Sequence, residues 1–285
     1  MKLNAEAHAF LRKRCELPEF EHGFSLVFIG DTHWGEECKG KAKPGVVYGH
    51  LLDRIKRNQL TYHNILAIIH GGDGTNIGEK SLEQFLTATR KSLHYDLAGK
   101  DHIPLFMNVG NHEYINDRNL NHYNSLVGDG LHVEEIWMRP QKTCLLLLNT
   151  GGPNRDGHFV DKQHFSEQLQ AAGAIIKAHP LYQFVIDMHI PPAFGPHRGK
   201  SHALNSEYTE QFTDFLNQYL KRVAAVVTHH RHCFNPSAIP YRYRGQVPVY
   251  LTAYAGHCDC PNLNGLKITY SDNKQGGWRT KISLV

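Results

Sequence analysis

The chain of 285 residues has no long apolar run, no dense set of cysteines and no strong charge of either sign. No stretch approaches the roughly 20 consecutive apolar residues that a membrane helix needs. The first 23 residues carry charges throughout and lack the apolar core of a secretory signal. We therefore expect a cytoplasmic protein that does not enter a membrane, although a signal cleaved from a longer precursor would leave the same sequence.

The cysteine pattern and the net charge argue against two further classes, disulfide-rich scaffolds and nucleic-acid-binding proteins. The six cysteines are spread over the whole chain, which is not the pattern of a small disulfide scaffold. Cys258 and Cys260 follow His257, but they lack the CxxC spacing and the second pair of a zinc site, so we interpret them as a loop with two thiols. A net charge of +4 gives little support for nucleic acid as a partner, without closing that possibility.

Histidine, in contrast, is abundant, with 21 residues. Histidine is the commonest metal ligand, and its side chain titrates nearest to neutral pH. The excess therefore favours a metal site or acid–base chemistry, and the positions of the histidines have to locate it.

Apolar runs of five to seven residues alternate with helical patterns, which is typical of an α/β fold. The runs predicted as buried strands are residues 25–29, 65–69, 104–109, 182–188 and 223–227. Two adjacent strand patterns within residues 131–149 predict a hairpin and a second sheet built from hairpins, and a helix over 161–178 should then return the chain to the first sheet. Ser81 is predicted as the N-cap of a helix that reaches Leu93.

We expect one domain over residues 1–285, with residues 1–24 as a lead-in segment, because the sequence contains no repeat, low-complexity segment or linker. The expected architecture is a four-layer αββα sandwich, in which two mixed sheets pack together and helices flank them.

Polar groups follow five of the apolar strands, at the point where each strand ends. In chain order they are Asp31-x-His33, Gly72-Asp73, Gly110-Asn111-His112-Glu113, His189 and His230-x-His232. Each motif alone is compatible with an ordinary solvated turn. Their repetition after successive strands favours a common site at the carboxyl ends of the sheet, where α/β proteins bind ligands.

The chemistry of this set predicts a metal centre. In an extended chain, residues i and i+2 point to the same side, so each of the two i, i+2 pairs can present two ligands to one point. Carboxylates, imidazoles and an amide oxygen suit divalent Mn, Fe, Co or Zn better than Ca or Mg. Seven ligands exceed one tetrahedral site and suit two metals about 4 Å apart, an arrangement that enzymes use to displace groups from phosphorus.

The ordered motifs resemble those of the calcineurin-like metallophosphoesterase family, which are DxH, GD, GNH followed by Asp or Glu, a lone His, and GHxH. The resemblance extends from residue 25 to about residue 257. It implies that Asp31, His33 and His232 bind one metal, that Asn111, His189 and His230 bind the second, and that Asp73 bridges both. It also implies a catalytic His112 that is not a ligand and that Glu113 orients. A hydroxide between the metals would be the nucleophile.

Three departures from the family pattern narrow the expectation. His229 replaces the Gly of GHxH, which affects the turn but keeps both ligand histidines. Asn76 stands where purple acid phosphatases carry their iron-binding tyrosine. Asn108 and Val109 precede Gly110, so the pattern of the Ser/Thr protein phosphatases is missing.

The resemblance implies hydrolysis of a small-molecule phosphate ester, with a phosphomonoesterase as the first choice and a phosphodiesterase or nuclease as the alternative. Arg231 and Arg198 are the cations nearest to the motifs in sequence and are candidates for phosphate binding, with a solvated surface arginine as the ordinary alternative. A different class is a non-catalytic interaction scaffold, as in a retromer subunit that resembles this family. The oligomeric state is not predicted by the sequence.

Overall fold

The structure is a computed structural model, which describes residues 1–37, 43–62, 64–76, 78–93, 102–152, 161–193, 202–231, 241–252, 265–272 and 278–285. Cys258 and Cys260 lie outside these ranges. None of the helices in the described ranges is both long enough and apolar enough to cross a membrane.

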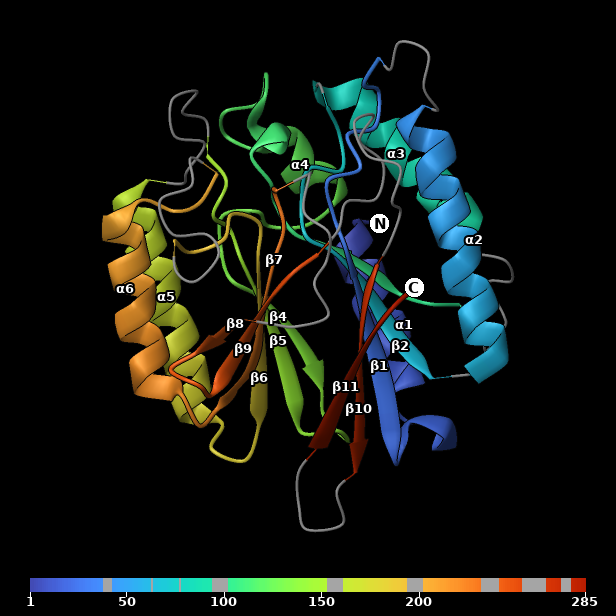
Figure 1. Ribbon diagram of the computed structural model, residues 1–285. Helices are drawn as coiled ribbons and strands as arrows, with labels where there is room; N and C mark the ends of the chain where they lie inside the picture. Colours follow the sequence, from blue (N-terminus) through green and yellow to red (C-terminus); the bar gives the residue numbers. More distant parts are fainter. Residues whose placement is uncertain are drawn as a thin grey trace.

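Two mixed β-sheets form the centre of the molecule (Figure 1). The first has the order β11-β10-β1-β2-β3 and consists of β1 (Gly23–Ile29), β2 (Ile65–His70), β3 (Leu105–Met107), β10 (Leu266–Asp272) and β11 (Trp278–Leu284). The second has the order β4-β5-β6-β7-β9-β8 and consists of β4 (Glu134–Met138), β5 (Thr143–Leu148), β6 (Gln183–Met188), β7 (Val223–Thr228), β8 (Tyr241–Tyr243) and β9 (Val247–Leu251).

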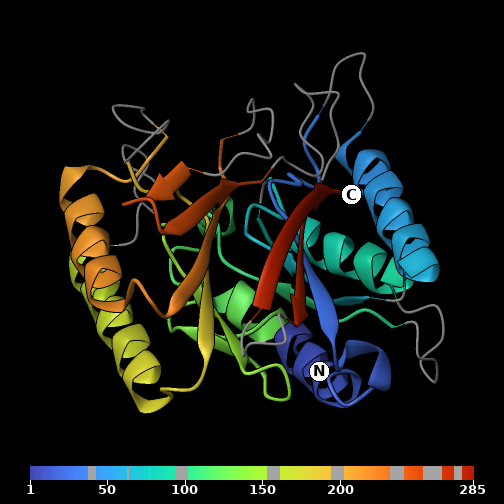
Figure 2. The same ribbon diagram turned by 60° about the horizontal axis from the view of Figure 1, so that its bottom comes forward.

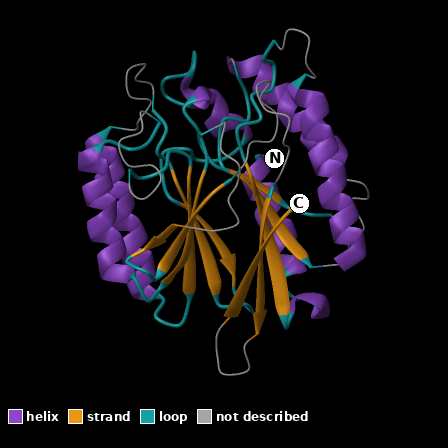
Figure 3. Cartoon of the chain, in the orientation of Figure 1, coloured by secondary structure: helices purple, strands orange, loops and turns teal. Residues whose placement is uncertain are grey.

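Helices cover the outer face of each sheet, as Figure 3 shows. In Figure 1, α2 (Pro44–Tyr62) and α3 (Gly78–Leu93) lie on one side, and α5 (Lys162–Ala178) and α6 (Ser206–Tyr219) lie on the other. The short α4 (Asn121–Leu126) and the 3₁₀ turns Pro18–Phe20 and His112–Tyr114 lie in connections, and α1 (Leu3–Arg14) contacts β2, β3 and β4. The predicted α/β fold, a four-layer αββα sandwich, is therefore confirmed.

The alternation of side chains along β1 explains why its sequence is apolar throughout. Phe24, Leu26 and Phe28 point into the core between the two sheets, where they meet residues of the second sheet. Val27 and Ile29 point to the opposite face, into the core under α2 and α3. Because both faces of this strand are covered, neither face can be polar.

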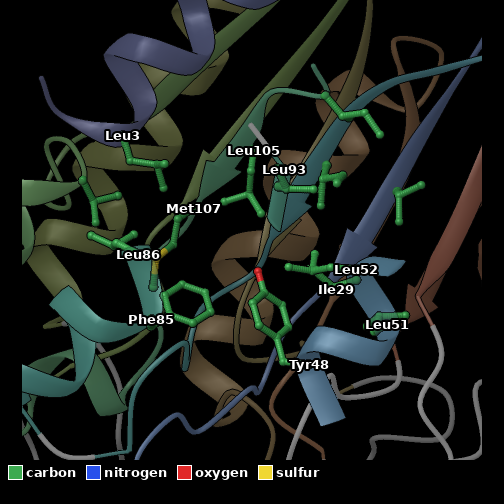
Figure 4. Close-up of a cluster of buried hydrophobic side chains, with 14 of the residues drawn as sticks. Leu3, Ile29, Tyr48, Leu51, Leu52, Phe85, Leu86, Leu93, Leu105 and Met107 are labelled. Carbon is green, nitrogen blue, oxygen red and sulfur yellow. The ribbon is translucent and has the colours of Figure 1, made fainter. Parts of the chain in front are cut away.

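The core under α2 and α3 is shown in Figure 4. Tyr48 of α2 and Phe85 of α3 have ring centroids 5.2 Å apart. Leu105 and Met107 of β3 belong to the same cluster. This packing fixes the two helices on the first sheet, so the loops at the strand ends have rigid anchors.

Three expectations about local structure are wrong. The hairpin predicted within residues 131–149 is present as the antiparallel pair β4–β5, but the second sheet as a whole is not built from hairpins, because β5, β6, β7 and β9 are parallel and antiparallel pairs occur only at its two edges. Helix α5 does not return the chain to the first sheet, since it connects β5 to the parallel neighbour β6. Parallel neighbours need such a crossover helix, and a buried apolar run does not reveal its partner. Ser81 is not an N-cap, because α3 begins at Gly78.

Candidate metal centre

The candidate site lies where the loops after β1 and β2 run side by side. The backbone amide of Asp31 donates to the carbonyl of Gly72 at 3.0 Å, and that of His33 donates to the carbonyl of Asp73 at 3.0 Å. Asp31, His33 and Asp73 all have left-handed backbone conformations, with φ of 53°, 48° and 52°. Such conformations cost about 1–3 kcal/mol each in residues other than glycine, and they cluster at functional sites.

These dihedral angles show that the chain is not extended at Asp31 and His33, contrary to the expectation from the sequence. Asp31 and His33 do not follow the alternation of an extended strand, since both residues have positive φ. Their convergence comes from the tight turn after β1 instead. His230, in the loop after β7, has the same kind of conformation with φ of 71°.

Asp73 is at the centre of the site and is buried. Its Oδ1 accepts a hydrogen bond from the backbone amide of His112 at 2.8 Å. Its Oδ2 lies 3.1 Å from Nε2 of His189 and 3.7 Å from Nε2 of His33. With His189 neutral, this Oδ2 accepts no hydrogen bond from the described residues. A buried carboxylate oxygen in this state is expected to have a cation as its partner.

His189, which follows β6, presents one nitrogen to the site. Its Nδ1 lies 2.9 Å from the carbonyl of Gly71, and a carbonyl can only accept, so Nδ1 carries the hydrogen. Nε2 then lies 3.1 Å from Oδ1 of Asn111 and 3.1 Å from Nδ1 of His230. In neutral His189 this nitrogen has a lone pair that faces other acceptor atoms, including Oδ2 of Asp73.

The charges around His189 attract a cation. Burial lowers the pKa of His189, but the nearby charges of Asp73 and Asp31 outweigh this effect and raise the pKa to about 9. The same aspartates would also stabilise a divalent metal at Nε2, which would take the place of the proton.

His112 is oriented by a backbone carbonyl. Its Nδ1 donates to the carbonyl oxygen of Asn76 at 3.1 Å, which leaves Nε2 as the acceptor nitrogen of a neutral ring. The ring of His112 meets that of His33 edge to face, with centroids 4.4 Å apart. Nδ1 of His33 lies 3.4 Å from Oδ1 of Asn76, so one asparagine contacts both histidines.

Glu113 has a different contact set from the one that the family resemblance implies. Its carboxylate accepts hydrogen bonds from the backbone amides of Gly110 and Asp73, at 2.7 and 2.8 Å, and from those of Gly74 and Thr75, at 2.8 and 3.4 Å. The expected contact with the imidazole of His112 is not among them. Glu113 instead fastens the loop after β2 to the loop after β3, and burial together with the charge of Asp73 raises the pKa of Glu113 to about 7.

Two groups of side chains could each hold a metal ion, and they share one residue. The first group is His33, Asp73 and His112, and the second is Asp73, His189 and His230. Within each group the ligand atoms lie within 4.8 Å of one another. Asp31 adjoins both, since its carboxylate accepts from the backbone amide of His230 at 3.0 Å. The shared aspartate and the mixed nitrogen and oxygen donors fit divalent transition metals.

Two of the predicted site residues, His232 and Arg198, lie outside the described ranges. Arg231 is half buried next to His230, and its backbone amide donates to the carbonyl of His229 at 2.9 Å. The described part of the structure thus brings together Asp31, His33, Asp73, Asn111, His112, His189 and His230.

Sequence reasoning missed a buried polar group behind the histidines. Asp187 of β6 lies 2.8 Å from Nε2 of His229, and its other carboxylate oxygen accepts from the side-chain amide of Asn108 at 2.9 Å. A signal was present, because Asp187 is a charged residue inside a mostly apolar strand. Such a residue needs a buried partner.

The fold of this chain is similar to the folds of several proteins of known structure. A protein proposed to be a 5′-nucleotidase of Staphylococcus aureus superposes with a TM-score of 0.55 and 16% identity, over 92% of this chain and 54% of that one. A 5′-nucleotidase of Candida albicans gives 0.52 and 12% identity, over 92% of this chain and 50% of the other. GAP50, described as the anchor in the inner membrane complex of Plasmodium, gives 0.56 and 11% identity, over 92% and 84%.

This likeness shows a shared fold. No protein-family model matches the chain, and no curated protein sequence matches it either. The chain spans about half of the length of the two nucleotidase structures.

Proposed function

We propose that the protein is a metal-dependent phosphoesterase of the calcineurin-like type. The observation that carries the proposal is that Asp73 belongs to two groups of side chains, each of which could hold a metal ion. In the first group we assign Asp73 and His33 as ligands, and we assign His112 to the substrate, in line with the family motif. A carboxylate common to two adjacent nitrogen-rich groups suits two neighbouring metals of the kind that dinuclear hydrolases use. The fold shared with structures named as 5′-nucleotidases supports the same reaction class.

In this proposal each metal has its own ligands on either side of Asp73. Asp31, His33 and His232 hold the first metal. Asn111, His189 and His230 hold the second, and the identity of the metals stays open among Mn, Fe, Zn and Co. Gly71 supports this assignment for His189, because its carbonyl fixes the hydrogen on Nδ1 and leaves Nε2 as the nitrogen that would bind the metal.

Bound metals would supply Lewis-acid polarisation of the phosphoryl oxygens and a more acidic water at neutral pH. With Nε2 also protonated, His112 would act beside them as a proton donor to the leaving group or as a hydrogen-bond donor to a phosphoryl oxygen. The hydrogen bond from Nδ1 to the carbonyl of Asn76 orients the ring and leaves Nε2 as the nitrogen available for proton transfer. Glu113 keeps His112 in place indirectly, because it fixes the loop from which His112 projects.

The substrate in this proposal is a small phosphate monoester. Arg231 and Arg198 are the candidates for binding its remaining phosphoryl oxygens. A phosphodiesterase or nuclease is the alternative within the same chemistry, because the same metal centre can serve mono- and diesters. The overall charge of +4 gives a nuclease little support.

Metal analysis and a substrate panel test the proposal. The purified protein should carry close to two transition-metal ions, measured by inductively coupled plasma mass spectrometry. After removal and readdition of Mn, Co or Zn, it should hydrolyse nitrophenyl phosphate and 5′-nucleotides faster than bis-nitrophenyl phosphate or cyclic nucleotides. Absence of bound metal, together with no activation by any of the three ions, would refute the proposal.

A non-catalytic anchor is the second candidate, because GAP50 shares the fold and is described as an anchor. The residues favour the enzyme, since His112 and six of the seven residues that we propose as metal ligands lie close together in the described ranges. A non-catalytic anchor would not require an oriented imidazole at His112. Full metal occupancy without hydrolysis of any ester in the panel would favour the anchor.

A further inference from the structure

His229 stands at the position where the family motif has glycine, and its imidazole is completely buried. Nε2 of this ring donates to Oδ2 of Asp187 at 2.8 Å. Nδ1 lies 2.6 Å from Oγ1 of Thr252. Both ring nitrogens therefore have fixed partners, and the ring has one defined orientation.

The ring of His229 fills the space next to two glycines, which directly follow β1 and β2 of the first sheet. A Cβ added at Gly71 would lie 1.8 Å from Nε2 of His229, and one added at Gly30 would lie 2.6 Å from Nδ1. Contacts this short mean that a side chain at either position would force the ring of His229 to move. The histidine of the second sheet and the glycines of the first are thus sterically complementary.

The same ring is connected to the candidate metal ligands. The backbone amide of His229 donates to the carbonyl of His189 at 2.9 Å, and the next residue is His230. Gly71, which lies against the ring, provides the carbonyl that accepts from Nδ1 of His189. A displacement of His229 would therefore move His189, His230 and the carbonyl that orients His189.

Asp187 extends this connection to the third strand of the first sheet. Its Oδ1 accepts a hydrogen bond from the side-chain amide of Asn108, a residue that follows β3. The same amide donates a second hydrogen bond to the carbonyl of Leu148 at 3.2 Å. The pair Asp187–His229 therefore contacts the ends of β1, β2 and β3 from the second sheet.

We infer that Asp187 and His229 position the metal-binding histidines: they lock His189 and His230 against Gly30, Gly71 and Asn108 of the first sheet. This role rests on the proposed metal centre. Polar partners that orient metal ligands typically change metal affinity by about 10- to 100-fold when they are removed. Asp187 and His229 orient the ligands through backbone and steric contacts and lie behind them.

A catalytic role for the same residues does not fit. Asp187, His229 and Thr252 form a chain of acid, imidazole and hydroxyl that looks like a nucleophilic triad. Asp187 and His229 are completely buried, and the side chain of Thr252 is nearly so, at 2% exposed. No substrate atom can reach the hydroxyl, so this chain serves to hold the site.

A double-substitution cycle between the two sheets tests the steric part. Gly71→Ala should lower the Tm of the metal-free protein, because the new methyl group overlaps the ring of His229. In the His229→Gly background the same Gly71→Ala change should cost much less, because the ring is gone. Additive Tm changes in this cycle would overturn the steric lock.

Metal binding tests the positioning part. Isothermal titration of the metal-free protein with Mn²⁺ or Zn²⁺ should show about 10- to 100-fold weaker binding in His229→Gly, at a temperature where circular dichroism shows the variant folded. Asp187→Asn keeps the shape and the contact with Asn108, and should weaken binding less. Wild-type affinity in both folded variants would overturn the positioning role.

Gly173→Ala is the matched control for steric damage away from the site. A Cβ there would lie 2.7 Å from Oη of Tyr219 between α5 and α6, so the Tm should fall while the metal affinity stays unchanged. If Gly173→Ala weakens metal binding as much as His229→Gly does, loss of stability alone explains the effect and the positioning role is wrong. Absence of metal binding in the wild type would instead refute the proposed function, while the Tm cycle still reports on the lock.

Discussion

The two halves of the candidate site are held in different ways. The half from the first sheet, with Asp73 and His112, is fastened through backbone amides that converge on the carboxylate of Glu113. The half from the second sheet, with His189 and His230, is supported by the buried side chains of Asp187 and His229.

The difference shows which substitutions each half tolerates. Backbone amides are present whatever the side chain, so the first half depends on one residue, Glu113, and on the left-handed conformations of its loops. The second half depends on several side chains that must fit one another, and coupled side chains respond to substitution non-additively. The following predictions test this comparison, from the largest expected effect to the smallest.

Asp73 belongs to both halves, and Asp73→Asn should have the largest effect. The substitution removes the negative charge that the two ligand groups share, so both metals should be lost and ester hydrolysis should become undetectable. Asn111→Ala should mainly weaken one metal. Metal content per chain measures both results, and equal metal content in the wild type and Asp73→Asn would contradict the shared role.

His112→Ala should separate chemistry from metal binding in the first half. It should keep the metal content and fold but reduce kcat by about 10²- to 10⁴-fold. If His112 protonates the leaving group, the loss should be smaller for nitrophenyl phosphate, whose leaving group is a weak base, than for an alkyl ester. Loss of metal together with activity would make His112 a ligand.

Glu113→Ala should destabilise the protein by about 3 kcal/mol or more, because several buried backbone amides lose their acceptor. Glu113→Gln is the matched variant: it keeps one carbonyl oxygen for the amides, but its NH₂ group faces donors, so it should recover part of the loss. Urea denaturation of the three proteins measures the difference. A change below about 1 kcal/mol in Glu113→Ala would show that the amides do not depend on this carboxylate.

His70, at the end of β2, should make the first half sensitive to acid. Burial and the neighbouring His229 lower the pKa of His70 to about 3, against the opposing effect of Asp31 and Asp73. The unfolded chain binds a proton at this residue below about pH 6.5, so the contribution of neutral His70 is present above pH 6.5 and is lost as the pH falls towards 3.

The corresponding experiment compares the wild type with His70→Gln. Between pH 7 and pH 5 the wild type should lose about 2 kcal/mol more of its free energy of unfolding than the variant. Urea denaturation at the two pH values gives this difference. Parallel losses in both proteins would assign the acid sensitivity to other groups.

The smallest effect is expected outside both halves, at the helix caps of the outer layer. Asp161 caps α5 by accepting from the backbone amide of His164, and Asn205 caps α6 by accepting from that of Tyr208. Replacing either by alanine should cost about 1 kcal/mol. Metal content should not change, and a change would mean that the outer helices control the site.

Much of the fold was predictable because buried strands have a plain signature. The run 65–69 was predicted as a strand, and β2 spans Ile65–His70. The partners of the strands were less accessible, since a strand such as β6 is apolar whether its neighbours are parallel or antiparallel. The assignment of α5 to the wrong connection follows from this ambiguity.

The site was predictable where ligands directly follow strands, as for Asp73 and His189. The contacts of Glu113 were not, because they go to backbone amides, which every residue has. The role of His229 was also hidden, because it depends on the room left by Gly71 and Gly30, and the sequence does not show that these residues meet.

The pairing of β1 with β10 has a consequence for synthesis of the protein. β1 lies near the beginning of the chain, and its antiparallel neighbour β10 lies near the other end, as the blue and red strands of Figure 2 show. While the ribosome makes the intervening residues, one side of β1 has no strand to pair with. The first sheet is therefore completed last, and chains released before Leu266 would expose an open strand edge, which is prone to aggregation.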